Sequence, residues 1–181
     1  MTDTNAANAA EVVGFWREAG PQRWFDRDAG FDLSFDARFR DLHFKAARRE
    51  LDAWADNAEG GLALLLLLDQ FPRNVFRGSG HAFATDPLAR MFAGWLLDAG
   101  LDQQVEPALR MFCYLPFQHS EQPGDQDRAV VLLQASGDPK WALHHRDLIR
   151  RFGRFPHRNA ALGRENTPEE RAYLEAGGFG G

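Results

Sequence analysis

Apolar residues recur along this chain at the spacing of an amphipathic helix. From Ser34 onward, Phe35, Phe39, Leu42 and Ala46 fall on one helical face, with Asp, Arg and Lys between them. Period-two alternation is not sustained anywhere, and β-branched residues are scarce beside Ala, Leu, Arg and Glu. The pattern therefore predicts an all-α protein. Helices are expected over residues 12–19, from 34 onward, and over 60–70, 85–100, 107–115, 125–134, 139–151 and 167–177.

The stretch from Gly60 to Gln70 has no polar face. Its residues 62–68 are leucine apart from one alanine, and a helix that is apolar all round belongs in the centre of a fold. Burial of each leucine contributes about 1.5–3 kcal/mol before chain entropy is subtracted. The run ends at Asp69 and Gln70, where a buried polar group is costly unless it has a partner. We therefore expect hydrogen-bonding groups from elsewhere in the chain to meet Asp69.

Two similar segments follow apolar helices, DQFPRN at 69–74 and RFPHRN at 154–159. Each is expected to be a turn at which the proline ends a helix and the asparagine caps the turn. A polar loop, a helix with a capping residue before proline (85–87 and 167–168) and a glycine stop then follow in the same order both times. A recurring unit of this kind predicts tetratricopeptide-like stacked helical hairpins, an α-α superhelix.

The length and composition favour one domain over residues 1–181. Fifteen phenylalanines and five tryptophans supply large anchors for a single core. Residues 1–8 are expected to be a disordered N-terminus, and residues 178–181 a flexible C-terminal tail.

The net charge and the lengths of the apolar runs limit which binding partners and which cellular compartment are expected. A net charge of −5 argues against nucleic-acid binding, because phosphate contacts need an excess of Lys and Arg on one face. The longest apolar run, 62–68, is far shorter than a membrane span, and the first residues lack the pattern of a secretion signal. The single cysteine, Cys113, cannot form an internal disulfide. A cytoplasmic protein without membrane contact is expected.

The motifs LALLLLLDQFPRNVFRG, AFATDPLAR, FCYLPFQHSE and RFGRFPHRNAALGREN stand in that order along the chain. Together they resemble the bacterial domain of unknown function 924 family, over nearly the whole length from Phe15 to Phe179. The resemblance implies a tetratricopeptide-like helical fold. It implies no particular activity, substrate, catalytic residue or cofactor.

The polar residues of these motifs form a candidate site if the two segments pack side by side. Arginine binds carboxylate or phosphate through two parallel hydrogen bonds, and histidine and asparagine supply oriented neutral donors. The sequence therefore predicts a pocket for a small anionic ligand or an acidic peptide end. Its expected residues are Asp69, Gln70, Arg73, Asn74, His119, Glu121, Arg154, His157, Arg158 and Asn159.

Three other interpretations stay open. In the first, Asp69 and Glu121 pair with Arg73, Arg154 and Arg158 as a structural network without a ligand. In the second, the protein is a phosphoester or ester hydrolase in which His119, His157 and Glu121 or Asp69 exchange protons. In the third, a helical face binds a protein partner and the polar residues are structural.

A metal-assisted form of the hydrolase would join His119 and Glu121 with His145 or Asp147. No HExxH motif is present, and His144-His145 is not followed directly by Asp, so neither metal nor cofactor is expected.

Overall fold

The structure is a computed structural model that describes the backbone of residues 4–181 and the side chains from Asn8 onward. Within these residues the regular structure is helical throughout, which confirms the all-α class. Part of the expected disordered segment 1–8 lies outside the described residues, and from Thr4 the chain is helical. The elements are α1 (Thr4–Ala19), α2 (Pro21–Trp24), α3 (Ala29–Ala47), η1 (Asp52–Asp56), α4 (Ala58–Leu65), η2 (Leu66–Gln70), α5 (Phe71–Val75), α6 (His81–Ala84), α7 (Asp86–Asp98), η3 (Asp102–Gln104), η4 (Arg110–Cys113), α8 (Leu115–Gln118), α9 (Pro123–Ser136), α10 (Lys140–Phe152), η5 (Pro156–Arg158) and α11 (Pro168–Glu175).

The leucine run lies at the centre of the molecule, as its pattern predicts. Residues 62–68 are at most 2% exposed, and α4 packs against α1, α7 and η1. Two glycines allow this close approach. A Cβ atom on Gly61 would lie 2.7 Å from the Leu96 side chain, and one on Gly60 would collide with the carbonyl oxygen of Trp54. The core is therefore built around a helix that has no solvent-facing side.

Helix α3 supports the elements that carry the first candidate residues. It begins after Asp28, whose carboxylate accepts hydrogen bonds from the N–H groups of Gly30 and Phe31. Its apolar face, which includes Phe35, packs against η2 and α5. The rings of Phe35 and Phe71 meet edge to face with their centroids 5.0 Å apart. This packing fixes the backbone on both sides of Asp69.

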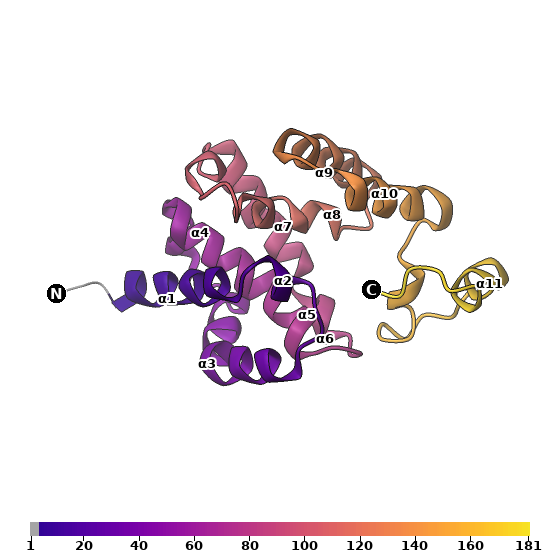
Figure 1. The fold of residues 1–181 in the computed structure, drawn as a ribbon, viewed down its shortest axis with the longest axis horizontal. Helices are drawn as coiled ribbons and strands as arrows, with labels where there is room; N and C mark the ends of the chain where they lie inside the picture. Colours follow the sequence, from indigo (N-terminus) through magenta and orange to yellow (C-terminus); the bar gives the residue numbers. More distant parts are fainter. Residues whose placement is uncertain (1–3) are drawn as a thin grey trace.

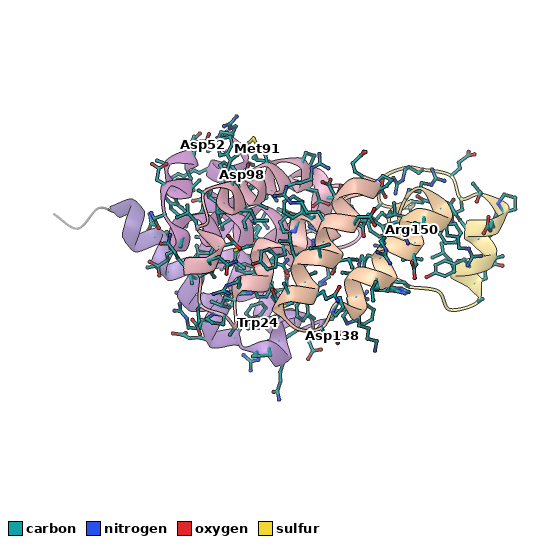
Figure 2. The ribbon with its side chains drawn as sticks, turned by 90° about the horizontal axis from the view of Figure 1, so that it is seen from above. Trp24, Asp52, Met91, Asp98, Asp138 and Arg150 are labelled. Carbon is teal, nitrogen blue, oxygen red and sulfur yellow. The ribbon has the colours of Figure 1, made fainter. Side chains whose placement is uncertain are left out.

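The C-terminal third of the chain lies to one side of the core elements α1–α7 (Figure 1). Helix α9 packs against α10, and Asp138 lies in the loop between them (Figure 2). A small second cluster of buried side chains joins Leu148 and Ile149 of α10 to Phe155. After α11 the last residues return toward α5 and α6 (Figure 1).

The prediction of one helix over 107–115 is wrong. The segment instead contains turns and the 3₁₀ helix η4, and α8 starts only at Leu115. Pro116 explains the break, because it has no N–H to donate to the carbonyl of Phe112 and fits the first turn of a new helix. In the described part of the chain no helix is long and apolar enough to cross a membrane.

Candidate functional site

The first segment, 69–74, is not a turn that ends a helix. The chain passes from α4 through the π-helical turn η2 directly into α5. The N–H of Phe71 bonds the carbonyl of Leu66, one residue further back than in an α-helix, and Pro72 has no N–H at all. The carbonyls of Leu67 and Leu68 therefore lose their usual helical donors.

Side chains from distant elements bond these carbonyls instead. His43 Nδ1 donates to Leu67 at 2.8 Å, and Thr85 Oγ1 donates to Leu68 at 2.6 Å. Thr85 thus precedes α7 as expected, but its hydroxyl does not cap that helix. Arg73 Nη1 donates to the carbonyl of Asp69 at 2.8 Å. The irregular turn is held by three separate parts of the chain, and it places Asp69 inside the protein.

The Asp69 carboxylate is 2% exposed and has partners on each oxygen. Gln70 Nε2 donates to Oδ2, and His119 Nδ1 lies 2.8 Å from Oδ1. Arg73 Nη1 is 3.1 Å from Oδ1. Burial alone would raise the pKa of Asp69, but the charge of Arg73 and the bond to His119 lower it to about 2. Asp69 is therefore ionised, and it fixes the ring of His119.

Asp86, at the start of α7, joins Arg73 and Arg158, which were predicted to share one site. Arg73 binds it through two parallel hydrogen bonds of 2.8 and 2.9 Å. Arg158 Nη1 donates to Asp86 Oδ2 at 3.3 Å. The two segments 69–74 and 154–159 thus meet at Asp86.

Arg158 is the least satisfied charged group of this cluster. Its side chain is 6% exposed, and among the described residues its guanidinium makes only the 3.3 Å bond to Asp86. Its Nε is enclosed without any partner. The guanidinium carbon lies 4.6 Å from the ring centre of Phe83 and 4.4 Å from that of Phe155. Burial, and then the charge of Arg73, lower the pKa of Arg158 to about 10, which leaves it protonated at neutral pH.

The second segment is positioned by Glu121. Gly153, in the left-handed conformation with φ 71°, ends α10 and turns the chain. Glu121 Oε1 then accepts the N–H of Phe155 at 2.8 Å, and Arg164 binds Glu121 through two bonds of 2.8 and 2.9 Å. Burial would raise the pKa of Glu121, but its bonds to Arg164 and Phe155 lower it. These bonds hold Phe155 beneath Arg158.

A second ion pair, separate from the Asp69 cluster, fixes α11. Glu170 completes a capping box with Thr167 and binds Arg154 through two bonds of 2.7 and 2.8 Å. Asn159 Nδ2 donates to Glu170 and to Asn166. The bond to Arg154 is the main cause that lowers the pKa of Glu170 to about 2. Arg154 and Asn159 therefore attach the second segment to α11 and do not bond the Asp69 cluster.

Three histidines lie near the arginines. The ring of His145 is 6.4 Å from that of His119 and 5.3 Å from that of Phe155, measured between centroids. Burial, and then the charge of His119, lower the pKa of His145 to about 3. Burial, and then Arg158, lower the pKa of His157 to about 3, and its Nδ1 is enclosed without a partner. Both rings are therefore neutral at physiological pH.

Phe179 covers these histidines on one side. Its ring lies 5.0 Å from those of His145 and His157, and Tyr173 accepts its backbone N–H at 2.8 Å. Beyond it is a surface hollow of about 540 Å³, which Trp141 and His144 also line. The segment expected to be a flexible tail thus packs against the histidine cluster.

Contacts between neighbours close into a ring, which we call the Arg–His ring. Arg158 contacts Asp86, Asp86 contacts Arg73, Arg73 contacts Asp69, and Asp69 contacts His119. His119 then neighbours His145, which neighbours Phe155, which stacks on Arg158. Its members are Asp69, Arg73, Asp86, His119, His145, Phe155 and Arg158.

Not every expected site residue lies on this ring. Asn74 donates instead to Asp32 of α3 at 2.7 Å. Glu121 pairs with Arg164, and Arg154 with Glu170, so neither of the expected pairings of Glu121 with Arg154 or Arg158 is formed. Within residues 4–181 no group of three or more His, Cys, Asp or Glu side chains is arranged to hold a metal ion.

Asp86 and Phe83 belong to the site, but the sequence pattern does not predict them there. Both stand in the motif AFATDPLAR, where a capping residue before proline indicates only the start of a helix. Arg164 stands in the last motif, ten residues after Arg154, and was not singled out either. The position of Asp86 in the sequence indicates the start of a helix. That its carboxylate also pairs with two buried arginines follows from the fold.

By its fold and site this is an all-helical protein with a buried ring of arginine, aspartate and histidine side chains. Residues 12–178 match the model of a family described as bacterial protein of unknown function (DUF924), and the chain belongs to this family. It is similar to a solved structure from Agrobacterium tumefaciens, the protein of unknown function ATU0120, with 59% identity and a TM-score of 0.93. That match covers 95% of this chain and 99% of the other. None of the curated proteins matches the chain.

Proposed function

We propose that the protein binds a small oxyanion, a phosphate or carboxylate group, at Arg158. The observation that carries this proposal is that the side chain of Arg158 is 6% exposed and its guanidinium makes one long hydrogen bond. An arginine that serves only structure is expected to satisfy most of its donors, because unpaired buried donors are costly. Nη2 of Arg158 makes no hydrogen bond to the described residues and, unlike Nε, is not enclosed, so it remains available to an anion.

The neighbouring charges support this assignment. Arg73 binds Asp86 through a bidentate pair and also contacts Asp69, so Asp86 keeps two hydrogen bonds without Arg158. The rings of Phe83 and Phe155 cover the guanidinium faces. A ligand would therefore meet the edge of the guanidinium, in the plane that favours paired bonds to a carboxylate or phosphate. The carboxylate of an acidic peptide end offers the same group.

Substitution of Arg158 by methionine is expected to weaken phosphate binding at least about tenfold, because a charge-assisted hydrogen bond contributes about 1.5–3 kcal/mol. The unliganded variant is expected to lose less stability than the roughly 3–5 kcal/mol of a broken buried ion pair, since Asp86 keeps its two hydrogen bonds to Arg73. Isothermal titration and urea unfolding measure the two quantities.

Arg151→Met is the matched control, because Arg151 is half exposed and pairs with Glu169 on the surface. It is expected to leave phosphate affinity unchanged. A wild-type protein that neither binds nor is stabilised by phosphate, acetate or an acidic peptide, together with a strongly destabilised Arg158→Met variant, would show that Arg158 is structural.

A further inference from the structure

The hydrogen bonds of the Arg–His ring assign the tautomers of two histidines. His145 Nδ1 lies 2.8 Å from the carbonyl oxygen of Trp141, which can only accept. His119 Nδ1 lies 2.8 Å from the ionised carboxylate of Asp69, which also only accepts. Both neutral rings therefore carry their proton on Nδ1. The Nε2 atom of each is left with a lone pair, so each is a hydrogen-bond acceptor.

These acceptor nitrogens have no partner within the described part of the chain. Neither Nε2 atom takes part in a hydrogen bond, and neither is among the enclosed unpartnered atoms, whereas Nδ1 of His157 is. The ring of His119 neighbours that of His145, and His145 and Arg158 both lie against the ring of Phe155. One cluster of neighbouring side chains therefore contains a cationic donor and two neutral acceptors.

We infer that the ligand of this site is an oxyanion that also carries an O–H donor, such as a hydroxycarboxylate or a protonated phosphate. Its charged oxygens bind Arg158, and its O–H group donates to Nε2 of His119, with His145 beside it. An anion without a donor leaves the histidine lone pair facing a negatively charged oxygen, which is unfavourable. This inference rests on the proposed function and adds the selectivity of the same site.

Asp69 is the positioning residue for this acceptor. It holds the His119 proton on Nδ1 and so keeps Nε2 available. Burial, and then the charge of Arg73, lower the pKa of His119, while Asp69 opposes them. His119 therefore stays neutral at physiological pH. The titratable and charged groups that face it are Asp69 on η2, Arg73 on α5, Asp86 on α7, His145 on α10 and His157 on η5.

The test compares matched anions that differ in the donor. Isothermal titration of the full chain at pH 7.5 with lactate and with propionate is expected to give about tenfold tighter binding of lactate, the effect of one satisfied hydrogen bond. Phosphate at pH 6, where the monoanion carries O–H groups, is compared with sulfate, which has none and carries the larger negative charge, so that charge alone would favour sulfate. Preference in both pairs indicates recognition of the donor in general, and preference only for phosphate assigns the site to phosphorus oxyanions.

His119→Phe keeps a ring but removes the acceptor, and it is expected to abolish the preference while weak anion binding at Arg158 remains. The comparison of the four anions in the wild type needs no variant to fold. Equal affinity for lactate and propionate together with equal affinity for phosphate and sulfate overturns the inference but leaves the anion site. Absence of binding by all four anions overturns the proposed function and, with it, this inference.

Discussion

Asp69→Asn is expected to destabilise the protein by about 3–5 kcal/mol, the usual effect of removing one partner from a buried charge pair. The variant would leave Arg73 with a neutral neighbour and would weaken the bond that orients His119. Urea unfolding at pH 7 measures the change. Asp127→Asn is the control, because Asp127 is more than half exposed and contacts Arg146 and Arg150 on the surface. That change is expected to alter stability by less than about 0.5 kcal/mol.

The same pair of proteins tests the charge of Asp69 through pH. The pKa of Asp69 is lowered to about 2, below that of the unfolded chain. Its contribution is therefore fully present above pH 4 to 5 and is lost as the pH falls toward 2. Asp69→Asn should show a shallower loss of stability over this range, with the remainder due partly to Glu170. Equal stability of Asp69→Asn and Asp127→Asn would show that the buried carboxylate network is not formed.

Glu170→Ala is expected to destabilise the C-terminal part of the protein by about 3 kcal/mol. Glu170 is 2% exposed on its side chain and satisfies Arg154, Asn159 and the backbone of Thr167 together. Its removal leaves these donors without their acceptor. Hydrogen exchange of the amides in 154–159 is expected to accelerate, because the segment loses its attachment to α11.

The neighbouring residue provides the control for this change. Among the side chains that the structure describes, Glu169 pairs only with Arg151, and it is 61% exposed, so Glu169→Ala is expected to be nearly neutral. Arg158 lies in the loosened segment, so Glu170→Ala is also expected to weaken phosphate binding. The effect would be indirect, because none of the described contacts of Glu170 is with Arg158. Equal hydrogen exchange in the two variants would contradict the role assigned to Glu170.

Local patterns predicted the local features of this protein well. The stripe of α3, the central leucine run and the capping box at Thr167 depend on residues close together in the chain, and the structure has all three. The approach of the segments 69–74 and 154–159 was predicted from their similarity. Their convergence on Asp86 follows from packing that no local pattern contains.

The ion-pair partners and the π-helical turn also depend on long-range packing, so the sequence pattern did not predict them. Pro72 predicts the end of a helix, but the helix continues. His43 and Thr85 donate hydrogen bonds to the carbonyls that have no backbone donor at the π-helical turn. Glu121 was expected to pair with Arg154 or Arg158 and instead binds Arg164. Each outcome depends on side chains brought together from distant parts of the sequence, since ion pairs form with whichever opposite charge the fold places nearest.

The proposed oxyanion site depends most on Nη2 of Arg158 being available to a ligand. Because its Nε is enclosed, the Nε–H proton should be observable as a distinct ¹H–¹⁵N resonance, assignable with Arg158→Lys. Titration with phosphate is expected to shift this resonance saturably, together with the ring signals of His119 and His145, while the resonance of Arg154 stays in place. A resonance of Arg158 that remains unchanged, while only exposed arginines such as Arg151 shift in proportion to salt, would contradict the oxyanion site.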